Sequence, residues 1–291
     1  MAVAGLPRLP PGRDVALDGR GITFVRELPG PPGAPTILLL HGWTASADLN
    51  WFACYAPLAR HYRVLAIDHR GHGRGIRTRA RFRLADCADD AAALIDQLGT
   101  SPVIAVGYSM GGPIAQLLWH RHRDKVAGLV LCATTDRFSS GTREGRAWLG
   151  GLQMMARMAR LTPDVVLQSL SRRVLSARVV DGPLSEWVRN EIARGNPRSL
   201  LEAGTAIGRY DAGPWIGAID VPTAVVLTEL DTVVPPGRQR RMAAAIPGAE
   251  VFPVAGDHAV CAADARRFVP ALLGALHSVS RRAARDVSVS R

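Results

Sequence analysis

The sequence predicts an α/β protein with a doubly wound, mostly parallel β-sheet of about eight strands. Two observations predict it. Short apolar runs rich in Val, Leu and Ile alternate with longer segments whose apolar residues recur at helical spacing. Several of these runs end in Gly, His or Asp, and open parallel sheets carry their sites at the carboxyl ends of strands. With 291 residues, 47% of them hydrophobic, the chain can bury one large core.

The first half of the chain is expected to supply a short hairpin and four strands that are buried on both faces. The hairpin pairs Val15–Leu17 with Ile22–Val25. The later runs are almost wholly apolar, which is typical of strands inside a parallel sheet. They are Thr36–Leu40, Arg63–Ile67, Val103–Val106 and Val126–Leu131. Helices are expected within Trp51–His61 and over Leu84–Leu98 and Pro113–His122.

A helical cap is predicted where this alternation stops. From about residue 137 to residue 198 the sequence holds arginine-rich segments with apolar residues at helical spacing and no strand pattern. Such an insertion divides the core into residues 1–136 and 199–278. Met154, Met155 and Met158 suit either a deformable apolar lining or the packing of the cap itself.

The sheet is predicted to resume after the cap and to end before a basic tail. Strands are expected at 222–227 and Val251–Val254, a helix at Gly237–Ala245, and a last helix that ends near Leu276. Residues 279–291 contain four arginines and one Asp, so we expect a basic, disordered tail. A weak contact between this tail and an anionic membrane surface is the alternative.

Composition narrows the classes of function. The net charge of +11 invites a nucleic-acid partner, but the arginines are scattered, and no zinc finger, basic helix or aromatic RNA-binding pattern accompanies them. A nucleic-acid role is therefore not expected. No apolar run reaches the roughly 18–20 residues of a membrane span, and no apolar signal segment is recognised, so a cytoplasmic protein is expected. The four cysteines are far apart in the sequence, which predicts free thiols rather than a metal site.

One stretch combines a strand, a sharp turn and a helix around a serine. The run Val103–Val106 leads into Gly107-Tyr108-Ser109-Met110-Gly111, and a helix-like segment follows. A serine at the apex of such a turn is held in a strained conformation that presents its hydroxyl clear of the backbone. The two glycines are needed because a Cβ at either position would collide where the helix folds back across the strand.

Taken together, the motifs at the strand ends resemble those of the α/β-hydrolase fold superfamily over about residues 12–278. Besides the serine turn, four motifs occur in the family's order: His41-Gly42, the run Asp68 to Gly73, Asp231-Thr232-Val233-Val234-Pro235 and Gly256-Asp257-His258. The stretch from Ala206 to Asp211 is loosely similar to the serine esterase and enol-lactonase branch.

The resemblance implies a catalytic triad. A serine hydroxyl is a poor nucleophile at neutral pH, so Ser109 needs an imidazole to take its proton, and His258 is the candidate base. Asp231 is the candidate acid that orients this imidazole. Asp136, just after the preceding strand, is the alternative, because some members supply the acid from that position. Relatives often have a glycine where this chain has Thr228.

The resemblance also implies two backbone donors for the oxyanion of the tetrahedral intermediate, the N–H groups of Trp43 and Met110. The indole of Trp43 is then expected to line the acyl pocket. His41, in front of this oxyanion turn, is expected to be a structural hydrogen-bonding residue, and the run Asp68 to Gly73 a structural turn beneath the site.

A serine nucleophile selects among the reactions of the superfamily. Epoxide hydrolases and haloalkane dehalogenases share the architecture but need a carboxylate at this position. Ser109 implies cleavage of a carboxylic ester, thioester or lactone of a small to medium, apolar acyl substrate through an acyl-enzyme, without cofactor or metal. Alternatives on the same fold are a carbon–carbon bond hydrolase, an acyltransferase, a cofactor-free haloperoxidase or perhydrolase, and a catalytically silent ligand-binding protein.

Overall fold

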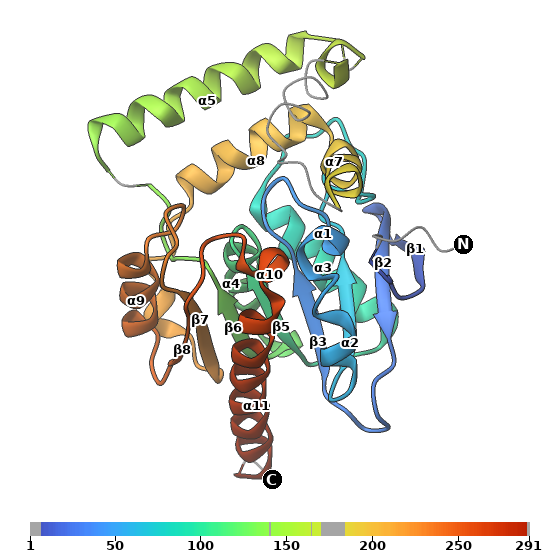
Figure 1. Cartoon of the computed structure of the whole chain (residues 1–291), viewed down its shortest axis with the longest axis vertical. Helices are drawn as coiled ribbons and strands as arrows, with labels where there is room; N and C mark the ends of the chain where they lie inside the picture. The colour runs from blue at the N-terminus through green and yellow to red at the C-terminus, as the bar shows by residue number, and fades with distance from the viewer. Residues whose placement is uncertain (1–6, 140, 164, 170–183, 290–291) are drawn as a thin grey trace.

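An eight-stranded sheet forms the centre of the protein (Figure 1). The structure is a computed structural model that describes residues 7–139, 141–163, 165–169 and 184–289. The strand order is β1-β2-β4-β3-β5-β6-β7-β8. β2 pairs antiparallel with both β1 and β4, and every pairing from β4 to β8 is parallel. The predicted fold class is therefore confirmed.

The strands begin and end close to the predicted positions, because their apolar runs are bounded by polar or turn-forming residues. Their bounds are β1 Gly12–Leu17, β2 Gly21–Leu28, β3 Thr36–Leu40, β4 Arg63–Ile67, β5 Val103–Tyr108, β6 Val126–Cys132, β7 Thr223–Thr228 and β8 Glu250–Val254. The central position of β3, between β4 and β5, explains why it is apolar throughout.

Helices cover both faces of the sheet. Since successive strand residues point to opposite faces, Leu38 and Leu40 of β3 join one apolar cluster, whereas Ile37 and Leu39 join the other. The first cluster is closed by α3 (Leu84–Leu98), α4 (Gly111–Arg121) and α9 (Pro236–Ala245). The second is closed by α1 (Ala47–Trp51), α2 (Tyr55–Ala59), α10 (Val260–Ala263) and α11 (Ala265–Val289). Short 3-10 helices lie at Arg123–Lys125 and Ile216–Ala218.

A helical insertion lies between β6 and β7, beyond the carboxyl ends of the parallel strands (Figure 1). It contains α5 (Arg143–Leu161), α7 (Ser185–Ala193) and α8 (Pro197–Arg209). The predicted boundary at residue 198 falls inside α8. This helix starts at Pro197, and the side chain of the preceding residue, Asn196, caps it by accepting a hydrogen bond from the N–H of Ser199. The helix also buries Ala203 and Ile207 in the first apolar cluster. The helix is therefore shared between insertion and core.

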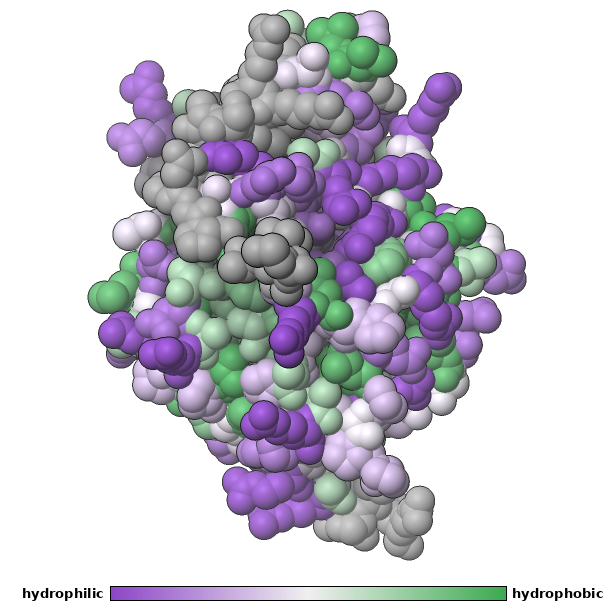
Figure 2. Space-filling model, turned by 45° about the vertical axis from the view of Figure 1, so that its right-hand side comes forward, coloured by the Kyte–Doolittle hydropathy of each residue, from purple (hydrophilic) through white to green (hydrophobic). Residues whose placement is uncertain are grey.

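The outer face of α5 carries exposed hydrophobic side chains. Met154, Met155 and Met158 are 55%, 52% and 61% exposed, so the expectation that they line a pocket or pack the cap is wrong. The residues that α5 buries are Leu152, Ala156 and Ala159, which follow each other at helical spacing. Figure 2 shows hydrophobic side chains at the top of the molecule, where α5 ends in Figure 1.

The predicted basic tail is helical as far as residue 289. α11 continues beyond Leu276 because Val279 is buried against Gly128 of β6. The guanidinium group of Arg282 donates to the carbonyl oxygens of Gly248 and Thr223, at 2.8 and 2.7 Å. The arginines at the start of this segment therefore belong to a helix that packs on the sheet. Residues 290 and 291 lie outside the described residues.

Among the residues that the structure describes, no helix combines the length and the apolar character that crossing a membrane requires.

Candidate active site

The serine turn has the strained geometry that its sequence predicts. Ser109 lies between β5 and α4 with φ of +51°, a value that residues other than glycine rarely adopt. A Cβ on Gly107 would lie 2.2 Å from the carbonyl oxygen of Gly111, which explains the glycine. The N–H of Ser109 donates to Cys132 O at 3.0 Å, and Thr134 Oγ1 donates to Ser109 O at 2.8 Å. These bonds hold the turn against β6.

His258 is in contact with both other residues of the predicted triad. It follows β8 in the loop before α10, and its Nε2 lies 3.0 Å from Ser109 Oγ. Its Nδ1 lies 2.7 Å from Asp231 Oδ2. The hydroxyl of Tyr108 donates to the carbonyl oxygen of His258 at 2.8 Å and so ties this loop to the residue before Ser109. Sequence reasoning missed this role of Tyr108.

Asp231 is buried in a shell of hydrogen-bond donors after β7. Its Oδ1 accepts the backbone N–H groups of Val233 and Val234, each at 2.8 Å. Its Oδ2 accepts the hydroxyl of Thr228 at 2.8 Å, in addition to His258. Burial alone would raise the pKa of Asp231, but His258 and the other donors lower it below its usual value. The carboxylate is therefore kept ionised beside the imidazole.

The alternative acid lies elsewhere. Asp136 Oδ1 accepts the hydroxyl of Thr135 at 3.0 Å and is 3.9 Å from the guanidinium group of Arg241. The structure therefore pairs His258 with Asp231 and not with Asp136.

Thr228 and Gln239 form a second layer behind the acid. The amide of Gln239 donates to Thr228 Oγ1 at 2.8 Å and to the carbonyl oxygen of Val234 at 2.7 Å, while its oxygen accepts the N–H of Thr228 at 3.1 Å. Gln239 has no exposed surface. Because Gln239 occupies the acceptor side of the Thr228 hydroxyl, the proton of this hydroxyl is directed at Asp231. The departure from glycine at position 228 thus supplies a donor, which sequence reasoning did not anticipate.

The predicted oxyanion turn lies directly against the serine. A Cβ on Gly42 would lie 3.4 Å from Ser109 Cβ, and the N–H of Gly42 donates to Asn50 Oδ1 at 2.9 Å. Within the described part of the chain, the backbone N–H groups of Trp43 and Met110 have no hydrogen-bond acceptor. Both donors are therefore available to a ligand. The indole of Trp43 is half-buried against Gly204 of α8, where Leu152 also packs.

Three buried histidines lie beneath this turn. His41 Nδ1 donates to Gly42 O at 2.8 Å, and its Nε2 accepts the N–H of His69 at 3.0 Å. The rings of His69 and His72 lie 4.3 and 5.5 Å from that of His41. Burial lowers the pKa of His41 to about 4 and that of His72 to about 3, and it also lowers the pKa of His69. All three are therefore neutral at neutral pH and act as packing and hydrogen-bonding groups.

A cavity of about 510 Å³ lies apart from these residues. It is bounded by α5, α8 and the segment that enters α3, and Arg81, Arg83, Arg157 and Arg209 are among its lining residues. Ser109, Asp231 and His258 do not line it. Of these three residues, His258 is the most open to solvent: its side chain is 23% exposed, whereas Ser109 and Asp231 are buried.

The fold and these contacts define a class of protein: an α/β protein that holds a hydrogen-bonded serine, histidine and aspartate at the carboxyl edge of its sheet. The family model of the alpha/beta hydrolase fold matches residues 35–264, and the chain belongs to that family.

Curated relatives include esterases. The chain is 32% identical over 209 residues to a pimeloyl-[acyl-carrier protein] methyl ester esterase of Neisseria meningitidis, with 71% of this chain and 78% of the relative covered. It is 32% identical over 256 residues to the esterase of the same name from Chromobacterium violaceum, with 82% and 92% covered. The predicted resemblance to the esterase branch is confirmed.

A solved structure supports the fold. The enol-lactonase from Burkholderia xenovorans superposes with a TM-score of 0.74 at 24% identity, over 91% of this chain and 100% of that one.

Proposed function

We propose that the protein is a serine hydrolase that cleaves a carboxylic ester, thioester or lactone through an acyl-enzyme on Ser109. The observation that carries this proposal is the continuous hydrogen-bonded chain from Ser109 Oγ through His258 to Asp231. A strained serine with a base within 3.0 Å and, among the described residues, two backbone donors without an acceptor beside it is the arrangement that acyl transfer requires.

The geometry supports a two-step reaction. Ser109 Oγ attacks the ester carbonyl carbon while His258 Nε2 takes the hydroxyl proton, and Asp231 stabilises the resulting imidazolium. The N–H groups of Trp43 and Met110 bind the oxyanion. The intermediate then collapses, the C–O bond breaks, and His258 returns the proton to the leaving alcohol. In the second step a water molecule gives a proton to His258 and attacks the acyl carbon; the bond between this carbon and Ser109 Oγ then breaks, His258 returns the proton to Ser109 Oγ, and the acid is released.

An apolar substrate of small to medium size fits the side chains around this centre. Leu230 and Val233, on either side of the acid turn, are 63% and 64% exposed, and Leu230 is tied to the loop of His258 through Gly256 O. Trp43 adds an aromatic ring next to the proposed oxyanion donor. By name, these two relatives are pimeloyl-[acyl-carrier protein] methyl ester esterases, which supports an ester as the substrate.

A panel of p-nitrophenyl esters of increasing chain length, with one lactone, tests the proposal. We expect hydrolysis by the natural chain and by Ser101→Ala, a control at an exposed serine, and loss of turnover in Ser109→Ala. Release of free acid distinguishes hydrolysis from acyl transfer. Full turnover in Ser109→Ala would overturn the proposal.

A further inference from the structure

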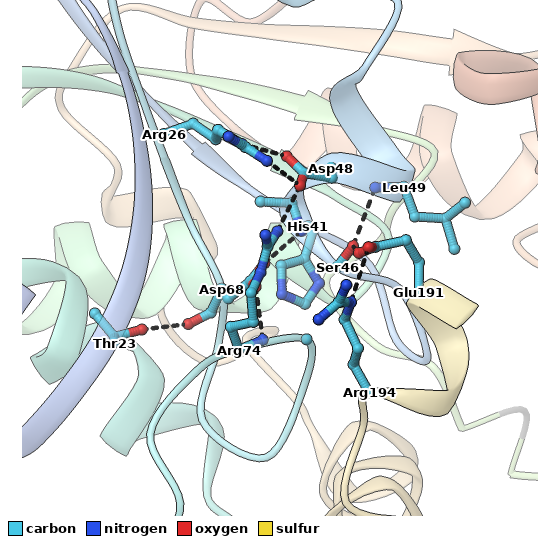
Figure 3. Close-up of polar contacts among 12 residues, drawn as sticks. Thr23, Arg26, His41, Ser46, Asp48, Leu49, Asp68, Arg74, Glu191 and Arg194 are labelled. Atoms are coloured by element: carbon cyan, nitrogen blue, oxygen red, sulfur yellow. Dashed lines mark hydrogen bonds and ion pairs between the residues drawn. The ribbon is translucent and has the colours of Figure 1, made fainter. Parts of the chain in front are cut away.

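The oxyanion turn is held from two sides, and one of them is the helical insertion. The segment from Gly42 to Ser46 joins β3 to α1, yet two of its side chains bond to helices far along the sequence. Ser46 Oγ donates to Glu191 Oε2 of α7 at 2.6 Å. Trp43 Nε1 donates to the carbonyl oxygen of Leu200 of α8 at 2.8 Å. Figure 3 shows the carboxylate of Glu191 pointing at Ser46.

Ser46 links α7 to the start of α1 through two hydrogen bonds. Its Oγ accepts the N–H of Leu49 at 3.1 Å, so it caps the N-terminus of α1 while it donates its own proton to Glu191. A hydroxyl has one proton, and the carboxylate fixes where it points. Glu191 is buried, 4% exposed, and its other oxygen accepts Arg194 Nε at 2.9 Å. The contact is therefore a charge-assisted hydrogen bond shielded from water.

Residues of the core hold helix α1 through a separate set of contacts (Figure 3). Asp68 Oδ1 accepts the N–H of Ala47 at 2.7 Å. Asp48 accepts two hydrogen bonds from Arg26, at 2.9 and 2.8 Å, and pairs with Arg74. This network fixes α1 to the core, whereas Glu191 fixes the turn to the insertion.

The turn itself contains a strained residue. Thr44 lies between the two anchored residues Trp43 and Ser46 and has φ of +61°. A residue with a Cβ leaves this left-handed conformation unless its neighbours are fixed. The proposed oxyanion donor, the N–H of Trp43, is one residue away, so any relaxation at Thr44 changes its direction.

We propose that Glu191 is a positioning residue for the oxyanion hole: through Ser46 it fastens the turn that carries the N–H of Trp43 to helix α7. This inference rests on the proposed function of Ser109. It makes the seating of the insertion a condition for stabilising the oxyanion, because α7 and α8 each hold one anchor of the turn.

Kinetics of Glu191→Ala on the best ester test the proposal, with Glu186→Ala as the matched control. Glu186 is an exposed glutamate of the same helix, so both variants remove one negative charge from α7. Loss of a single oxyanion donor reduces kcat by about 10²–10³ in hydrolases, and a displaced donor costs part of that. We expect Glu191→Ala to lose about 10- to 100-fold in kcat with KM nearly unchanged, and Glu186→Ala to match the natural chain.

A second readout separates positioning from a general loss of structure. A trifluoromethyl ketone forms an oxyanion on Ser109, so its affinity should fall in Glu191→Ala by the same factor as kcat/KM. The pH profile should keep its shape, since His258 and Asp231 are untouched. Glu191→Gln retains an acceptor for Ser46 and should stay within about 3-fold of the natural chain. Ser46→Ala combined with Glu191→Ala should be no worse than the more affected single variant.

Several outcomes decide the matter. If Glu191→Ala hydrolyses esters and binds the ketone as Glu186→Ala does, the core network alone positions the turn and the inference is wrong. Equal losses in kcat for Glu191→Gln and Glu191→Ala would also contradict it. If the natural chain shows no turnover that depends on Ser109, the proposed function is wrong, and the inference that rests on it is wrong as well.

Discussion

The two sides of the candidate site are built in different ways. The acid turn is local: Thr228, Asp231 and Gln239 lie within eleven positions of one another, on β7, the following loop and α9. The oxyanion turn depends on remote residues, because Ser46 and Glu191 are 145 positions apart and Trp43 and Leu200 are 157 apart. A local network forms with its own strand and helix, whereas a remote one exists only once the insertion has docked. We therefore expect changes on the acid side to alter proton transfer and changes on the oxyanion side to alter stabilisation of the intermediate.

The largest effect is expected for Asp231→Asn. In triads of this kind, replacing the acid by an amide lowers kcat about 10³- to 10⁴-fold, because the imidazole is no longer held in the right tautomer. Asp136→Asn is the matched control, since Asp136 is also buried but has no contact with His258. Steady-state kinetics of both variants give the result. A greater loss in Asp136→Asn than in Asp231→Asn would reverse the assignment of the acid.

Mild acid should lower the free energy of unfolding through the three histidines beneath the oxyanion turn, whereas Asp231 loses its contribution only at lower pH. His41, His69 and His72 have pKa values lowered by burial, so below pH about 6.5 the unfolded chain binds protons that the folded chain does not. Each histidine is expected to reduce the free energy of unfolding by about 2 kcal/mol between pH 7 and pH 5. The pKa of Asp231 is lowered too, but for an acid that contribution to stability is lost only as the pH falls below about 3.9.

Denaturant unfolding at pH 7, 6 and 5 measures the loss in the free energy of unfolding that we expect from the three histidines. His72→Leu should flatten the pH dependence by about one proton. A free energy of unfolding that is the same at pH 7 and pH 5 would contradict the account of the three histidines.

A smaller effect is expected for Thr228→Val. The substitution keeps the shape of the side chain and removes the donor to Asp231 Oδ2, so the pKa of Asp231 should rise and the carboxylate should be held less firmly beside His258. We expect about a 10-fold loss in kcat, the size of one hydrogen bond to a charged group. Thr228→Ser retains the hydroxyl and should restore kcat. A kcat in Thr228→Val equal to that of the natural chain would mean that the hydroxyl does not act on the acid.

The sequence predicts what depends on local pattern and misses what depends on docking. Helix α3 occupies the predicted residues Leu84–Leu98 because its apolar spacing is regular and Gly99 ends it in a left-handed conformation. The contacts of His258 with Ser109 and Asp231 could be proposed because each of the three residues follows a strand, and strands in this order bring their carboxyl ends together. The hydrogen-bond partners that hold the two turns could not be predicted. Glu191 is one of many charged residues in an arginine-rich insertion, and no local pattern marks it as the acceptor of Ser46.

The same limit explains the errors. The arginines after Leu276 look like a solvated tail because their neighbour Val279 gives no sign that it reaches Gly128 of the sheet. The methionines of α5 look like a lining because they are apolar, but Leu152, Ala156 and Ala159 occupy the buried stripe. In both cases the pattern within one helix does not say which side meets another element.

Labelling with a fluorophosphonate, followed by mass spectrometry of the peptides, tests the central claim most directly. The reagent phosphonylates a serine hydroxyl only when a base removes its proton, so it reports on the contact between Ser109 and His258. We expect one adduct, on the peptide that contains Ser109, and its loss in both Ser109→Ala and His258→Ala. An adduct on another serine, or undiminished labelling in His258→Ala, would contradict it.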